Sequence, residues 1–166
     1  FKLPNSVYTT LNFTEADFAF DDKVIVSSIF RDVLIWSIVD SKPLAMLHAP
    51  VGIITKLIVD RERKGLIGYI GHSREIHLWN LNGAFTDGTV IDALTESISK
   101  ICVAEDAPRA IAVCSNSDEM GVVDLDTGFL TDLYTHEGHV INCAISSCGS
   151  FAIVAIKAKK NQILQI

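Results

Sequence analysis

The sequence lacks the long apolar run that a membrane-spanning helix requires. None of its 166 residues belongs to such a run, which would need about 18 consecutive apolar residues. No charged segment followed by an apolar one opens the chain either. We therefore expect no membrane contact. The first residue is Phe1 rather than Met, so we interpret the chain as a piece cut from a longer protein, and such a piece could have lost a signal segment.

Basic residues are also scarce. The chain has 14 Lys and Arg against 20 Asp and Glu, which gives a net charge of −6. The basic cluster at 157–160 is short. This balance disfavours nonspecific binding to nucleic acid, and we expect none.

Cysteines are few, and most of the four lie inside apolar, strand-like runs: Cys102, Cys114, Cys143 and Cys148. In an intracellular protein such cysteines usually act as small buried hydrophobic residues. The pattern predicts a cytoplasmic or nuclear protein.

A helical period is missing as well. The β-branched runs at 24–26 and 53–55 favour strands. With 49% hydrophobic and 20% charged residues, the composition is typical of a soluble globular protein and argues against disorder.

What the sequence does contain is a recurring strand pattern. The segment 74–81 alternates apolar and polar residues, as a half-buried strand does, and runs into the turn Asn82-Gly83. Similar segments recur, and their anchor positions are 43, 44 and 42 residues apart: Trp36, Trp79, Val123 and Gln165. A fixed period of this size predicts a repeat architecture.

Each period divides into short strands separated by Gly, Asp, Ser and Asn. The predicted strands are 16–20, 23–30, 33–39, 43–48, 53–59, 65–71, 75–81, 89–94, 98–104, 109–115, 120–125, 129–135, 140–146, 151–157 and 162–166. Four strands per period indicate antiparallel meanders. A sandwich or barrel is the competing fold, but neither is expected to repeat at this period, so we favour a β-propeller.

Two stretches carry a family resemblance. Gly138-His139 precedes a strand and a small-residue turn at 146–149, and 122–128 combines a third strand with an exit of the form Asp124-x-x-Thr127-Gly128. With Trp36 and Trp79, these features resemble the WD-repeat family of β-propellers over almost the whole chain.

The resemblance assigns structural repeat positions to Trp36, Trp79, Val123, Asp124, Gly138 and His139. In the family, His, Ser or Thr, Asp and Trp form a buried hydrogen-bonded set within each blade. This chain has only parts of that set, so we expect its blades to depend more on apolar packing.

The resemblance thus implies an all-β propeller of four-stranded antiparallel blades. The expected blades are about 11–50, 51–95, 96–137 and an incomplete 138–166. Because propellers close with about four to eight blades, two interpretations stay open. Either residues before Thr10 supply the missing strand and close a small ring of about four blades, or the chain is part of a larger propeller of about seven.

No residue set predicts catalysis. His136, His139, Cys143 and Cys148 have spacings that occur in zinc sites, but we interpret them as core cysteines and hydrogen-bonded histidines. The acidic residues near Asp124 lack the loop of a calcium site, and we read 126–128 as a turn. We expect no metal, no cofactor and no enzymatic activity.

Turns on the rims are the expected binding elements. Arginine is frequent in binding hot spots, so we name as candidate partner contacts Arg31, Arg61, Arg63, Arg74 and Arg109. The predicted function is a non-enzymatic scaffold of the WD-repeat type that binds other proteins or other segments of its own longer chain. The alternative is a regulatory or sensor propeller domain of a larger multidomain signalling ATPase.

Overall fold

The structure is a computed structural model, which describes residues 14–20, 22–48, 52–60, 65–70, 73–81, 88–92, 94–114, 117–157 and 162–165. These residues form β-strands joined by turns, and the described part of the chain contains no helix, hence none that is long and apolar enough to cross a membrane. The all-β prediction is confirmed.

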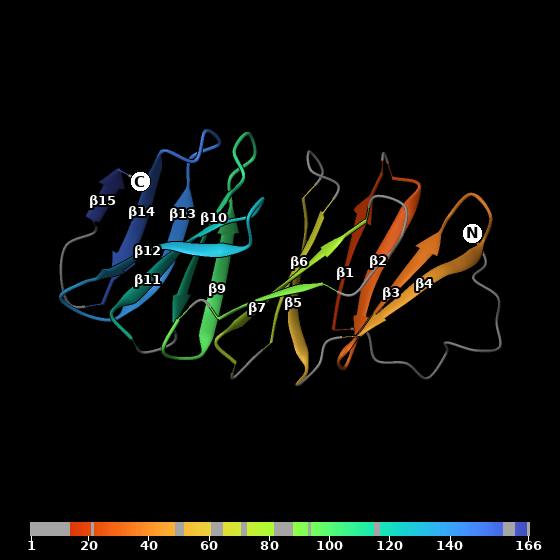
Figure 1. Cartoon of the computed structure of the whole chain (residues 1–166), viewed down its shortest axis with the longest axis horizontal. Coiled ribbons are helices and arrows are strands. Elements are labelled where there is room, and N and C mark those ends of the chain that lie inside the picture. The colour runs from red at the N-terminus through yellow and green to blue at the C-terminus, as the bar shows by residue number, and fades with distance from the viewer. Residues whose placement is uncertain are drawn as a thin grey trace.

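The strands form four antiparallel sheets, each made of consecutive strands (Figure 1). The first sheet contains β1 (Glu15–Ala19), β2 (Val24–Ile29), β3 (Asp32–Ser37) and β4 (Lys42–His48). The second contains β5 (Ile54–Asp60), β6 (Gly65–Ile70), β7 (Glu75–Asn80) and β8 (Thr89–Asp92). The third contains β9 (Ile98–Val103), β10 (Arg109–Cys114), β11 (Glu119–Asp124) and β12 (Phe129–Thr135). The fourth contains β13 (Val140–Ile145), β14 (Phe151–Ile156) and β15 (Gln162–Gln165).

Three apolar cores hold the sheets together, one at each junction between neighbours. The core between the first and second sheets includes Val26, Ile35, Leu47, Ile54 and Trp79. The core between the second and third includes Ile76, Ile91, Ile101, Ala112 and Val123. The core between the third and fourth includes Ile111, Met120, Cys143, Val154 and Ile156. Each sheet alternates its side chains between two faces, so the internal sheets contribute to two cores.

A backbone hydrogen bond recurs at each junction. The first residue of one sheet donates its N–H to a carbonyl in the turn between the second and third strands of the preceding sheet. The three bonds are Ile54 N to Phe30 O at 2.8 Å, Ile98 N to Ser73 O at 2.9 Å and Val140 N to Ser117 O at 3.0 Å. Each pair of neighbouring sheets is therefore joined by a backbone hydrogen bond between corresponding positions.

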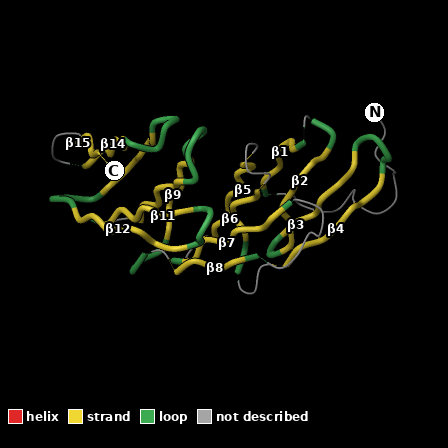
Figure 2. The backbone as a smooth tube through the Cα atoms, turned by 45° about the horizontal axis from the view of Figure 1, so that its top comes forward, coloured by secondary structure: helices red, strands yellow, loops and turns green. Residues whose placement is uncertain are grey.

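The four sheets stand in a row, with the first sheet at one end of the row and the fourth sheet at the other (Figures 1 and 2). The described turn residues between first and second strands lie along the upper edge in Figure 1, and we call this edge the upper rim. The described turn residues between second and third strands lie along the lower edge, the lower rim. The described strands do not close into a ring. The residues before Thr10, which the small-ring interpretation invokes, lie outside the described part.

Strand pairing corrects one expected anchor. Val123 lies opposite Ala110, which is buried against the second sheet. In the fourth sheet the corresponding buried residue is Ala152, and its partner is Leu164 rather than Gln165. Gln165 instead pairs with the half-exposed Phe151. The expected anchor at Gln165 is therefore wrong by one position.

Candidate interaction surfaces

The anchor residues of the repeat point toward the preceding sheet. Trp79 belongs to the core shared with the first sheet, and Val123 belongs to the core shared with the second. Trp36 has the corresponding place in β3, on the side opposite to Ile35, which packs toward the second sheet. Trp36 thus lies on the outer face of the first sheet, where a preceding sheet would lie.

This first outer face is largely apolar. Cross-strand pairing places Phe18 opposite Ile25, Ile25 opposite Trp36, and Leu34 opposite Met46. Trp36 and Leu34 are buried, whereas Phe18 is 48% exposed and Met46 is 56% exposed. Among the described strands, none outside the first sheet lies against this face (Figures 1 and 2).

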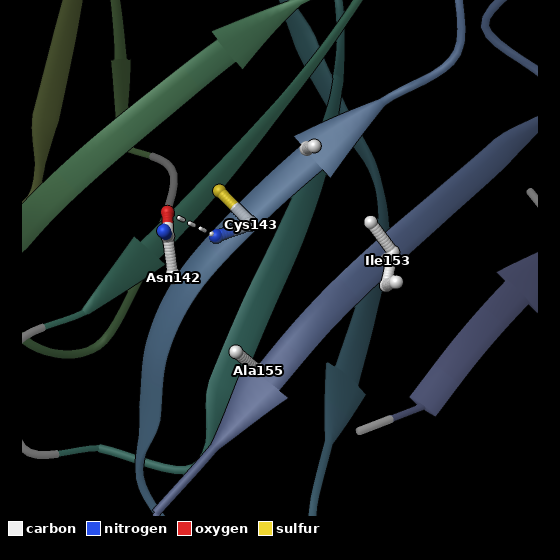
Figure 3. A pocket seen from close by; sticks show the side chains of 5 residues that line it. Asn142, Cys143, Ile153 and Ala155 are labelled. Carbon is white, nitrogen blue, oxygen red and sulfur yellow. Dashed lines mark hydrogen bonds between the residues drawn. The ribbon is translucent and has the colours of Figure 1, made fainter.

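The outer face of the fourth sheet is the second apolar end of the row. Phe151 is 48% exposed and Ile153 is 42% exposed. Beside them is an open recess of about 140 Å³, shown in Figure 3, whose walls are Asn142, Cys143, Ala144, Ile153 and Ala155. Exposed aromatic and branched side chains on one sheet face are typical of a surface that packs against another protein segment.

Asp124 stabilises the turn between β11 and β12. Its carboxylate accepts hydrogen bonds from Asp126 N at 3.0 Å, Thr127 N at 2.8 Å and Thr127 Oγ1 at 2.9 Å. The bonds from Thr127 above all lower the pKa of Asp124, since they favour the ionised carboxylate. Gly128 has a φ of 73°, which suits glycine, so the segment forms the turn expected from the sequence.

Gly138 and His139 lie where the third sheet leads into β13. Gly138 has a φ of 130°, and a Cβ added there would come within 2.9 Å of Ile156 Cγ2. The His139 carbonyl accepts a hydrogen bond from Lys157 N at 2.9 Å. This pair thus fixes the backbone at the open end of the hairpin formed by β13 and β14.

The three candidate arginines that the structure describes do not gather on one surface. Arg31 and Arg74 lie at the lower rim, in or next to turns between second and third strands. Arg74 Nε is 3.0 Å from Asp92 Oδ1, and both side chains are exposed. Arg109 begins β10 beside the upper rim, and its Nη1 donates to the Gly149 carbonyl at 2.8 Å. Arg61 and Arg63 lie outside the described residues.

The cation of Arg109 thereby joins two sheets. Gly149 belongs to the turn between β13 and β14, and the neighbouring Ser147 carbonyl accepts from Asp106 N at 2.8 Å. The upper-rim turns of the third and fourth sheets are therefore hydrogen-bonded to each other. In this structure Arg109 positions the rim, whereas Arg31 and Arg74 present charge at the opposite rim.

The zinc-like residues do not come together. Within the described ranges, no three side chains of His, Cys, Asp or Glu are grouped as a metal site requires. Cys143 lies against Cys102 of the third sheet, while Cys148 is exposed in a rim turn beside Ser146.

Two features have no counterpart in the expectations from sequence. His77 is buried and stacks on Trp79, with ring centroids 5.6 Å apart. Cys102 and Cys143 meet across two sheets. Their separation of 41 residues, close to the repeat period, is a signal that could have paired them, because both lie in first strands.

The chain was also compared with known proteins. No family model matches it, and no curated protein matches its sequence. Its function must therefore be argued from the surfaces described above.

Proposed function

We propose that this chain forms part of a WD-repeat-type β-propeller and acts as a non-enzymatic scaffold that binds other proteins through its rim turns. In this proposal each sheet is one propeller blade. The first strand of each sheet is the innermost strand, and the fourth is the outermost where it is present. The proposal includes a cytoplasmic or nuclear location.

The observation that supports the proposal most strongly is the repeated junction between sheets. Trp79 and Val123 each pack toward the preceding sheet, and the same backbone hydrogen bond links every neighbouring pair of sheets. Radial repetition of four-stranded antiparallel sheets is the arrangement of a propeller. Trp36 follows the same rule on the outer face of the first sheet, which supports a further sheet at that position.

The rims support the binding role. Hydrogen bonds from Asp106 N to Ser147 O and from Arg109 Nη1 to Gly149 O hold the upper-rim turns of the third and fourth sheets in place. A surface that is already ordered loses little conformational entropy when a partner binds. At the lower rim, Arg31 is exposed and Arg74 makes only an exposed ion pair, so both cations are accessible to a partner.

Charge reversal on each rim tests the function. Proteins that copurify with the full chain are identified, and each is then titrated in purified form against three proteins: the unmodified chain, Arg31→Glu/Arg74→Glu and Glu105→Arg. The first variant alters the lower rim, and the second alters the upper rim. We expect a true partner to lose affinity by about tenfold or more with one variant and to be little affected by the other.

Circular dichroism and unfolding curves show whether both variants keep the fold. Equal affinity of every partner for all three proteins would contradict binding through the rims. Turnover of a nucleotide or another substrate by the purified chain would contradict the non-enzymatic assignment.

A further inference from the structure

The thiols of Cys102 and Cys143 meet at the junction between the third and fourth sheets. Cys102 lies on β9 and Cys143 on β13, and their Sγ atoms are 3.5 Å apart. Cys102 Sγ is also 3.1 Å from the Cys143 carbonyl oxygen, to which the neutral thiol donates. Cys143 is buried in the apolar core, whereas Cys102 is partly exposed at its margin. The pair therefore has one accessible sulfur and one sheltered sulfur.

Surrounding groups distinguish the two sulfurs electrostatically. The hydrogen bond from the Cys143 thiol, helped by the charge of Lys100, lowers the pKa of Cys102 to about 7, although burial acts in the opposite direction. The pKa of Cys143 is raised, because its proton is held by Cys102 and because it is buried. Cys102 is thus the sulfur that ionises first, with a substantial thiolate fraction near neutral pH, and Cys143 is the thiol beside it.

A polar clamp keeps the two strands in place at this point. Lys100 Nζ donates a hydrogen bond to Asn142 Oδ1, and the same oxygen accepts from Cys143 N at 2.9 Å. Lys100 lies two residues before Cys102, and Asn142 directly precedes Cys143. The clamp therefore fixes the sulfur atoms near one another and holds a positive charge beside them.

We propose that Cys102 and Cys143 form an oxidisable dithiol, which a hydroperoxide such as hydrogen peroxide converts into a disulfide between the third and fourth sheets. Forming the disulfide shortens the distance between the two Sγ atoms from 3.5 Å to a bond length of about 2.05 Å. The assignment concerns a modification site and does not depend on binding through the rims.

The reaction has two steps. The Cys102 thiolate attacks one peroxide oxygen, the O–O bond breaks, and Cys102 becomes a sulfenic acid. The hydroxide that leaves takes up the proton that Cys102 lost on ionising, which gives the first water. The Cys143 sulfur then attacks the Cys102 sulfur: an S–S bond forms and the S–O bond breaks. The departing hydroxide takes up the proton of Cys143 and leaves as water. Two thiols are oxidised, and one hydrogen peroxide is reduced to two molecules of water.

The two remaining cysteines differ in ways that matter for the test. Cys114 is buried, its thiol donates to the Glu96 carbonyl at 3.1 Å, and burial raises its pKa to about 11. It is expected to react slowly. Cys148 is exposed, and hydrogen bonds from Ser146 and Ser150 lower its pKa to about 7. Because Cys148 would react with peroxide as well, the test uses the Cys148→Ser chain as its background.

The Cys148→Ser protein is treated with increasing hydrogen peroxide under native conditions, and free thiols are then counted in denaturant. Peptides are mapped by mass spectrometry without reduction. We expect loss of two of the three remaining thiols, a mass lower by two hydrogens, and one crosslinked peptide pair containing Cys102 and Cys143. The melting temperature should rise on oxidation and return to its starting value after dithiothreitol.

Matched variants make the outcome specific. Adding Cys143→Ser should abolish the crosslink and leave Cys102 as a sulfenic acid, which dimedone traps. Adding Cys102→Ser should abolish both products. The proposal is overturned if the native Cys148→Ser protein keeps all three thiols at peroxide concentrations that oxidise Cys148 in the unmodified chain. It is also overturned if Cys102 accumulates as sulfinic acid while Cys143 stays free.

Discussion

At the residue scale, β6 carries two glycines with different surroundings. A Cβ added to Gly68 would lie 2.8 Å from Cζ3 of the buried Trp79 and 3.4 Å from Leu57 Cδ2. We predict that Gly68→Ala lowers the free energy of unfolding by about 1–3 kcal/mol, since the indole is packed on all sides and must shift. Urea denaturation of the purified variant measures the change.

Gly65 on the same strand is the matched control. The nearest atoms to a Cβ there are Asp60 Cβ at 3.7 Å and Trp79 O at 3.8 Å, which are ordinary contacts. Gly65→Ala should therefore leave stability unchanged or raise it slightly, because alanine restricts the unfolded chain. Equal destabilisation by both substitutions would show that the indole of Trp79 does not limit the space at Gly68.

A pH prediction concerns His77, which is buried beside Trp79. Burial lowers the pKa of His77 below 6.5, and the nearby Glu75 carboxylate only partly opposes this effect. The unfolded chain therefore binds the proton more readily than the folded one. As the pH falls below about 6.5, the free energy of unfolding should decrease by up to about 1.4 kcal/mol per pH unit from this group.

Unfolding curves at a series of pH values check this expectation. His77→Phe retains an aromatic ring for stacking on Trp79 and should flatten the profile between about pH 7 and 5. His48→Gln, at an exposed position, serves as the control and should retain the loss of stability that His77 causes. An unchanged slope in His77→Phe would assign the pH dependence to other groups.

Sequence reasoning identified residues with local roles more readily than residues with tertiary roles. The turn at 126–128 was expected, because the bonds between Asp124 and Thr127 span three residues. The bond from Arg109 to Gly149 spans 40 residues, so composition at the turn gives no sign of it. Because the sequence gives no sign of this bond, it predicts that Arg109 contacts a partner. In the structure the Arg109 side chain instead joins the third and fourth sheets.

At the element scale, this contrast gives a prediction about the turns. Arg109→Ala removes a partly buried, charged hydrogen bond between the third and fourth sheets, and should lower the free energy of unfolding by about 1.5–3 kcal/mol. Arg74→Ala removes only an exposed ion pair with Asp92 and should cost about 0–1 kcal/mol. Thermal and urea unfolding distinguish the two. Similar small losses would mean that Arg109 does not join the sheets.

Most strands were predictable because their apolar residues alternate and their turns contain Gly, Asp, Ser and Asn. All fifteen predicted strands correspond to strands of the structure, with ends that differ by no more than two residues. The register of the fourth sheet was less predictable. Alternation over 161–166 fits either Leu164 or Gln165 as the anchor, and only pairing with Ala152 decides between them.

At the scale of the whole molecule, the two apolar end faces predict self-association of the isolated chain. We expect sedimentation velocity to show a mass that increases with concentration, because burying the exposed Phe151 and Ile153 against another apolar face is favourable. Phe151→Glu/Ile153→Glu should shift the protein toward the monomer. Phe129→Glu, at a 70% exposed position on β12 away from the end faces, should leave association unchanged.

A monomer at every concentration, unaffected by these substitutions, would contradict the prediction that the end faces need a covering sheet. The repeat period does not give the number of sheets that a closed ring would need. The period specifies the size of one sheet, whereas ring closure depends on the angle between sheets and on contacts between the first and last of them.

The recurring backbone bond at the sheet junctions has a consequence for amide hydrogen exchange. Ile54, Ile98 and Val140 each donate their N–H across one junction, so each amide is protected only while its own pair of sheets stays together. In arrays where each unit contacts only its neighbours, stability is approximately a sum over junctions. These three amides are therefore native probes that report, one by one, the opening free energy of the three junctions.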